Sequence, residues 1–168
     1  MTSMPQMVSI FNGLGGLSAV FLSFIELYKI SFLGGENSIP YQIILLLSLF
    51  IGSIAFTGSL LAFAKLDGYR WSEKLTLPYQ HIINIVLFLV VTALSYQYFT
   101  TSNDFNFIFL ILGVSLIYGI FFVAPIGGAD MPVVISLLNS FTGITAALTG
   151  IIFSNNVMLL GGILVGAA

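Results

Sequence analysis

The sequence contains very little charge. Of its 168 residues, 6% are Asp, Glu, Lys or Arg, whereas 58% are hydrophobic. A water-soluble fold cannot cover so much apolar surface with so few polar side chains, so the composition excludes a soluble globular protein. The net charge of −2 provides neither a basic face for nucleic acid nor a polybasic patch for a membrane surface. The lipid bilayer is therefore an expected partner, and nucleic acid is not.

Cysteine is absent, which excludes a disulfide, an iron–sulfur cluster and a thiolate zinc site. No set of residues has the spacing of metal ligands, and no nucleophile lies beside a base, so we expect no metal and no catalytic residue in this chain. The first cation is Lys29, so the chain lacks the basic start of a signal peptide. The first apolar segment is therefore interpreted as part of the mature protein.

Long apolar segments make up most of the chain. A bilayer core about 30 Å thick needs roughly 20 apolar residues per helix. The sequence therefore predicts an all-α membrane protein, a polytopic bundle of about six transmembrane helices in one domain over residues 1–168. The helices are predicted at about 4–28, 40–64, 82–98, 105–124, 131–153 and 157–168. The last segment is short for a span, and we expect it to be incomplete.

The distribution of cations predicts the orientation of the bundle. Lys65, Arg70 and Lys74 lie in the second connection, against Lys29 on the opposite side. The positive-inside rule places the second connection in the cytoplasm. The amino terminus and the turn before Met131 are then cytoplasmic too, because each lies an even number of crossings away.

An internal repeat relates the two ends of the chain. Residues 4–12 match residues 131–139, the same register matches Gly16 with Gly143, and residues 49–53 resemble residues 164–167. The first and fifth helices differ by four crossings, so we predict a parallel two-helix repeat. In each copy, small and polar residues spaced by 3, 4 and 3 positions share one helix face. These stripes are Ser9, Asn12, Gly16 and Ala19 in the first copy, and Ser136, Asn139, Gly143 and Ala146 in the second.

Asn12 and Asn139 are the main candidates for a functional site. Each lies about nine residues after the helix start, or roughly 13 Å along the axis, near the middle of the membrane. One interpretation is that these amides hydrogen-bond neighbouring helices together. The other is a polar path in which the amides, with Ser9 and Ser136, hold water for proton movement. An amide does not titrate at neutral pH, so it would orient such a path without carrying the proton.

Asp130 also has two interpretations. Its carboxylate most simply caps the following helix. Beside Gly128, it is also placed to contact a moving partner domain.

Four phrases of the sequence resemble the beta subunit of the proton-translocating NAD(P) transhydrogenase. They are residues 127–140 (GGADMPVVISLLNS), 4–8 (MPQMV), 56–66 with FTGS and AFAKL, and 164–167 (LVGA). The resemblance implies an enzyme complex in which hydride transfer from NADH to NADP is coupled to inward proton flow across the cell (inner) membrane. It also implies a membrane and NAD-binding alpha subunit, an NADP(H)-binding domain after the last helix of the beta subunit, and a dimer of protomers. NADP and NAD would be bound in the full complex and not by this chain, which would not be catalytic alone.

The resemblance also suggests roles for single residues. Asn139 matches a family position in the proton path, and Asp130 matches one that communicates with the NADP(H) domain. Many relatives have a proton-carrying histidine where this chain has Asn12; others have asparagine there and take a histidine from the alpha subunit, and we expect this chain to be of the second kind. Two other classes stay open at this point, a small secondary transporter and a structural membrane subunit.

Overall fold

The computed structural model describes residues 3–35, 38–69, 72, 75, 79–101 and 104–167, and within these ranges the chain forms helices and no strand. The all-α prediction is therefore confirmed. The elements are α1 (Ser3–Leu33), α2 (Ile39–Leu66), α4 (Gln80–Thr100), α5 (Phe105–Val123), the 3-10 helix η1 (Gly128–Asp130), α6 (Met131–Ile152) and α7 (Asn156–Ala167).

The predicted bounds agree with the observed helices to within two residues, except at the end of the first helix. That helix was predicted to end near Tyr28 but continues to Leu33. The termination signal is Gly34, whose φ of +67° is a left-handed conformation that glycine adopts without strain. The next residue, Gly35, donates its N–H to the carbonyl of Lys29 at 3.2 Å, so the chain folds back onto the end of α1.

The helices are suited to a lipid environment. In the described part of the chain, α1, α2, α4, α5 and α6 are long and apolar enough to cross a membrane, and α7 is a shorter apolar helix. The outer side of α4 exposes Ile82, Ile85 and Leu89, each more than half accessible. Apolar side chains so exposed are favourable against acyl chains and unfavourable against water. The chain is therefore a multi-pass membrane protein.

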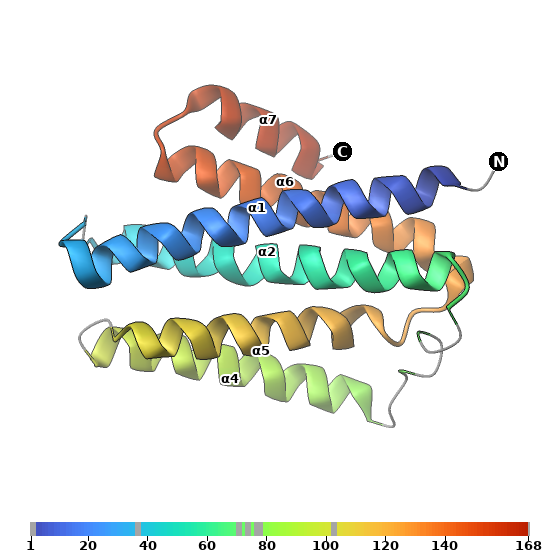
Figure 1. Ribbon diagram of the computed structural model, residues 1–168, viewed down its shortest axis with the longest axis horizontal. Helices are drawn as coiled ribbons and strands as arrows, with labels where there is room; N and C mark the ends of the chain where they lie inside the picture. Colours follow the sequence, from blue (N-terminus) through green and yellow to red (C-terminus); the bar gives the residue numbers. More distant parts are fainter. Residues whose placement is uncertain are drawn as a thin grey trace.

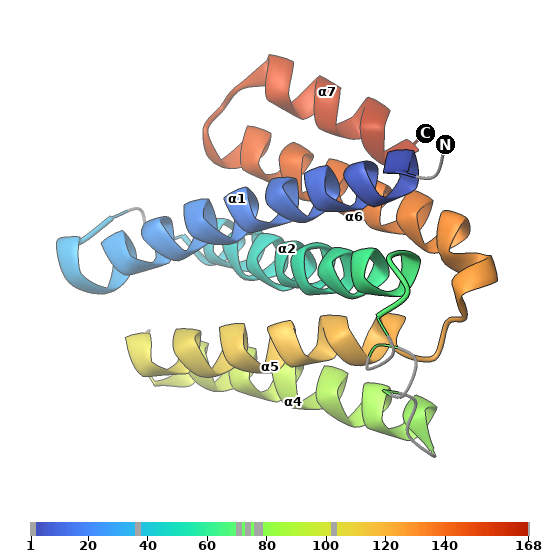
Figure 2. The ribbon, with the colours of Figure 1, turned by 45° about the vertical axis from the view of Figure 1, so that its right-hand side comes forward.

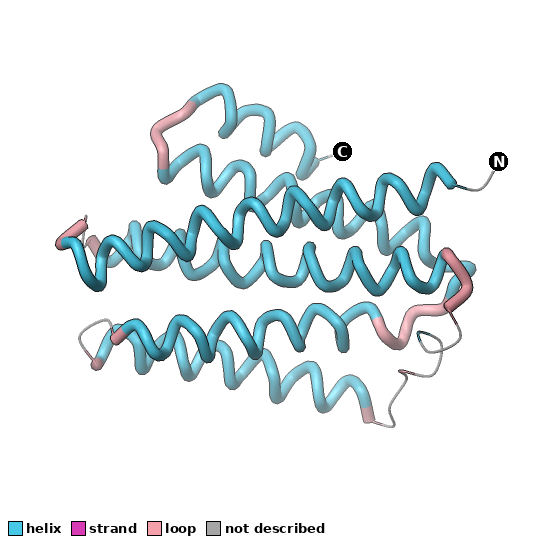
Figure 3. The backbone as a smooth tube through the Cα atoms, in the orientation of Figure 1, coloured by secondary structure: helices cyan, strands magenta, loops and turns pink. Residues whose placement is uncertain are grey.

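Helix α2 lies at the centre of the bundle. It packs against α1, α5 and α6, while α4 packs on α5 and α7 packs on α6 (Figure 1). The rotated view shows α4 and α5 on one side of α2, with α6 and α7 on the other (Figure 2). The described connections lie at the two ends of the bundle (Figure 3). Helices α1 and α6 both begin at the end where the chain starts, so the predicted repeat is parallel.

Glycine contacts hold each copy of the repeat together. A Cβ on Gly16 of α1 would lie 2.8 Å from the carbonyl oxygen of Gly52 in α2. In the second copy, the matching Gly143 of α6 lies directly against the backbone of Gly166 in α7. Helices in lipid gain little from hydrophobic burial, and small residues let their backbones approach for van der Waals contact. The same device therefore builds both hairpins, α1–α2 and α6–α7.

Candidate functional site

The candidate site lies where α1 crosses α6, between the two copies of the repeat. Asn12 is 7% exposed, and its side-chain Nδ2 donates to the carbonyl of Ile135 at 3.4 Å. In return, the hydroxyl of Thr142 donates to the backbone carbonyl of Asn12 at 3.1 Å. Ile135 and Thr142 flank Asn139 along α6, so the two amides occupy one level of the bundle, as the repeat predicted.

The polar stripe of α1 is buried along its length. Ser9, Asn12, Gly16 and Ala19 are all buried. The hydroxyl of Ser9 donates to the carbonyl of Ser59 in α2 at 2.7 Å. The hydroxyl of Ser59 is buried and has no hydrogen-bond partner in the described part of the chain. The stripe therefore faces both α2 and α6, and one polar atom beside it is left unsatisfied.

The matching stripe of α6 is arranged differently. Ser136 is exposed and Asn139 is partly exposed. Asn139 lies four residues after Ile135 and three before Thr142, so it shares the side of α6 that faces Asn12. Its side chain makes no hydrogen bond to any residue that the structure describes. The amide of Asn12 is thus hydrogen-bonded inside the bundle, whereas the amide of Asn139 is partly exposed.

Asp130 does not cap α6 with its side chain. It occupies the N-cap position, with φ −91° and ψ 0°, but its carboxylate makes no capping hydrogen bond. The cap interpretation is therefore wrong, because the backbone enters α6 through η1 (Gly128–Asp130) and not from an extended conformation that would aim the carboxylate at the first turn. Asp130 is exposed, whereas the next residue, Met131, is fully buried. The carboxylate therefore stands on the surface at the start of α6.

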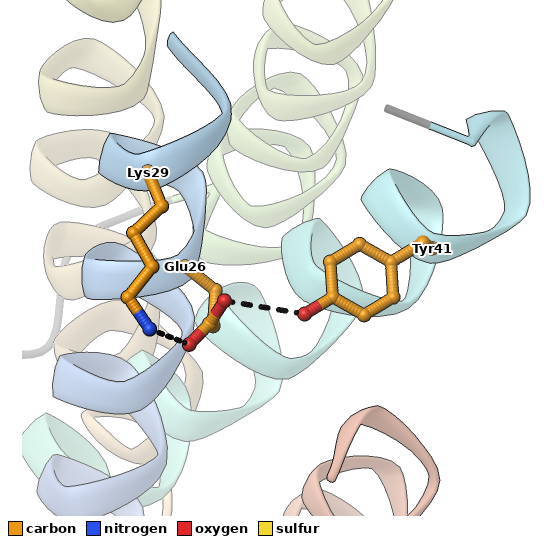
Figure 4. Close-up of polar contacts among 3 residues, drawn as sticks. All are labelled: Glu26, Lys29 and Tyr41. Atoms are coloured by element: carbon orange, nitrogen blue, oxygen red, sulfur yellow. Dashed lines mark hydrogen bonds and ion pairs between the residues drawn. The ribbon is translucent and has the colours of Figure 1, made fainter. Parts of the chain in front are cut away.

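A second polar group lies at the opposite end of α1 (Figure 4). The ammonium of Lys29 is 2.6 Å from the carboxylate of Glu26, an i, i+3 ion pair within α1. The hydroxyl of Tyr41 in α2 donates to the other carboxylate oxygen of Glu26 at 3.3 Å. Glu26 is thus bonded within α1 and across to α2, and this group is separate from the candidate site.

The predicted orientation and the expected absence of a metal site can be compared with the structure only for the residues that it describes. Arg70 and Lys74, which support the predicted orientation, lie outside the described residues. For metals, the described residues contain no group of three or more His, Cys, Asp or Glu side chains that could hold an ion.

Thr142 belongs to the site but is not among the residues predicted from the sequence. Its signal is positional, because it lies three residues after Asn139 and so on the same side of α6. A Cβ on Gly15 would lie 2.6 Å from its methyl group, so Thr142 also fixes how closely α1 approaches α6.

Comparison with known proteins places this arrangement in a family. The family model described as NAD(P) transhydrogenase beta subunit matches residues 1–168. Two relatives named NAD(P) transhydrogenase subunit beta, both from Rhodospirillum rubrum, are 37% identical over 174 aligned residues. The alignment covers 100% of this chain and 37% of each relative, so the chain spans little more than a third of their length. The helices form a membrane bundle, the family model matches the whole chain, and both relatives carry the same family name. The chain therefore belongs to the NAD(P) transhydrogenase beta subunit family.

Proposed function

We propose that this chain is the proton-translocating membrane part of an NAD(P) transhydrogenase, which couples hydride transfer from NADH to NADP with inward proton flow across the cell (inner) membrane. NADP and NAD bind in other parts of the complex, and this chain has no catalytic role by itself. Its partners are the membrane and NAD-binding parts of the alpha subunit and the NADP-binding domain, in a dimer of protomers.

The partly exposed amide of Asn139 is the observation that carries this proposal. An amide without a partner is costly against lipid, so Asn139 requires either water or a polar group from another helix beside it. It lies at the level where Asn12 binds the backbone of α6. Asn139 therefore marks a point, well inside the membrane, where a wetted path can run along the surface of this chain.

The two amides have different parts in the proposed path. Asn12 is packed against the backbone of α6, so it holds α1 at the correct depth and spacing. Asn139, partly exposed on the side of α6 that faces Asn12, orients water, with Ser136 one turn before it. Neither amide releases a proton at neutral pH, so the titrating group comes from elsewhere. A histidine from a membrane helix of the alpha subunit, seated against Asn139, would supply it.

Replacing Asn139 tests this role. In proteoliposomes containing the full complex, Asn139→Leu should abolish the proton uptake that accompanies hydride transfer, because leucine cannot orient water. Asn84→Leu is the matched control: its amide donates to the carbonyl of Phe121 at 3.4 Å between α4 and α5, away from the site. An Asn139→Leu complex that still takes up protons at the wild-type rate would remove this residue from the path.

Replacing Asp130 tests the link to the nucleotide domain. Because the carboxylate caps nothing in the described chain, Asp130→Ala should leave the yield of folded complex unchanged. Coupled activity should fall, since Asp130 beside Gly128 is exposed and available to a second domain. A lower folded yield with normal coupling in the complex that remains would show that Asp130 is structural.

A further inference from the structure

The side chain of Lys65 connects α2 to the segment that leads to Asp130. Its ammonium donates to the carbonyls of Ala124 at 2.5 Å, Ile126 at 2.8 Å and Val123 at 3.4 Å. Lys65 lies in the last turn of α2, whereas these carbonyls belong to the end of α5 and the connection after it. The lysine therefore caps a neighbouring helix.

The contact has a clear electrostatic basis. The last carbonyls of a helix lack intrahelical donors and carry the negative end of the helix dipole, so a cation is stabilised there. An ammonium has three N–H donors, and three carbonyls from one short segment lie within its reach. Because these bonds are charge-assisted, each is stronger than one between neutral groups. The path of the backbone after α5 is thus fixed by one side chain from α2.

The fixed segment continues directly into the exposed turn. The N–H of Asp130 donates to the carbonyl of Gly127 at 3.1 Å, one residue after the Ile126 carbonyl that Lys65 binds. Beyond Asp130, Met131 is fully buried beside Leu61 of α2. The turn is therefore held to α2 on both sides, by a cation before it and by apolar packing after it.

The same end of α2 also holds the start of α1. The amide of Gln6 donates to the carbonyl of Leu66 at 3.4 Å and to the carboxylate of Asp67 at 3.2 Å. Gln6 precedes Asn12 by less than two helical turns. Movement of the end of α2 would therefore be transmitted to α1 and its buried amide.

We propose that Lys65 is a positioning residue that ties the Gly127–Asp130 turn to α2, so that displacement of the turn by the NADP-binding domain reaches α1 and Asn12. This role rests on the proposed function. It uses no proton transfer by Lys65 itself. Its essential element is the fixed attachment between the ammonium and the three carbonyls.

The test uses the full complex with Ala129→Cys as a reporter. These 168 residues contain no cysteine, and any cysteine in the other parts of the complex is replaced first. Ala129 is exposed in the turn, so the rate of its modification by a membrane-impermeant maleimide reports the mobility of the turn. Lys65→Met retains the apolar stem and removes the cation, and it should raise this rate about tenfold if it allows local opening of the turn. Lys65→Arg should recover most of the slow rate, because arginine still donates to carbonyls. Lys29→Met is the control, since that cation pairs at the opposite end of α1.

Protons taken up per hydride transferred are then measured in proteoliposomes. Lys65→Met should lower this ratio to roughly half or less, with hydride transfer by the detergent-solubilised complex preserved. An unchanged modification rate, or an arginine variant as mobile as the methionine variant, would overturn the attachment. A raised modification rate with a normal ratio would overturn its role in coupling. If the wild-type complex itself moves no protons, the proposed function fails, while the modification rates still decide the attachment.

Discussion

The contact between Gly16 and Gly52 gives the sharpest prediction about stability. We expect Gly16→Ala to destabilise the protein and Gly113→Ala to leave it unchanged or slightly stabilised. A Cβ on Gly16 would lie 2.8 Å from the carbonyl oxygen of Gly52, 2.9 Å from the Cβ of Ala55 and 2.9 Å from the backbone nitrogen of Phe56. At Gly113, in the middle of α5, nothing lies within 4 Å of such a Cβ.

The magnitude follows from two opposing terms. Two of the three atoms that the new methyl group would meet are backbone atoms, so α1 must move away from α2. Overpacking of this kind costs about 1–3 kcal/mol. The better helix propensity of alanine returns about 0.5–1 kcal/mol. At the midpoints of these ranges the net loss at Gly16 is about 1 kcal/mol, and at Gly113 only the favourable term remains.

The assay is equilibrium unfolding of the detergent-solubilised protein by a denaturing detergent, followed by far-ultraviolet circular dichroism. Gly16 lies one turn after Asn12, so a displaced α1 would also weaken the 3.4 Å hydrogen bond from Asn12 to α6. This loss would add to the destabilisation. The packing argument is refuted if Gly16→Ala is as stable as the wild type, or if Gly113→Ala is equally damaging.

Further substitutions test other parts of the architecture. Gly166→Ala should be tolerated because its Cβ would meet nothing closer than 3.5 Å, whereas Gly143→Ala, against the backbone of α7, should lower the thermal stability measured in detergent. Ser9→Ala should cost about 1 kcal/mol in the same unfolding assay, since it removes a buried hydrogen bond of 2.7 Å. Asp104→Ala should also cost about 1 kcal/mol, because its carboxylate caps the first turn of α5 at 3.1 Å, and Asp104→Asn should retain most of the stability.

The two copies of the repeat show which features follow from local sequence and which depend on neighbouring helices. Spacing alone placed Asn12 and Asn139 on polar faces at equal depth, because helix geometry is local. Burial of these faces depends on which helices lie beside them. In the first copy, α2 and α6 cover the stripe of α1; in the second, Asn139 remains partly exposed. Matching sequences therefore have different surroundings, which no pattern within either copy encodes.

Lys65 gives a second example of the same distinction. A cation in the last turn of a helix is expected to interact with the carbonyls of its own helix. The observed acceptors of Lys65 are backbone oxygens at the end of α5 and in the connection after it, about 60 residues away in sequence. Every residue has a backbone carbonyl, so no residue type in the sequence predicts which carbonyls Lys65 binds.

The sequence by itself determined the membrane environment, the helical spans, the parallel repeat and the small faces that allow close packing, because these follow from hydropathy and from helix periodicity. The tertiary structure alone decided that Asn12 binds the backbone of α6 and that Asn139 is partly exposed. It also decided that Asp130 is exposed without capping α6, and that Lys65 binds the carbonyls at the end of α5 and in the connection after it. These features depend on which helices become neighbours, and that choice is made by contacts between residues far apart in the chain.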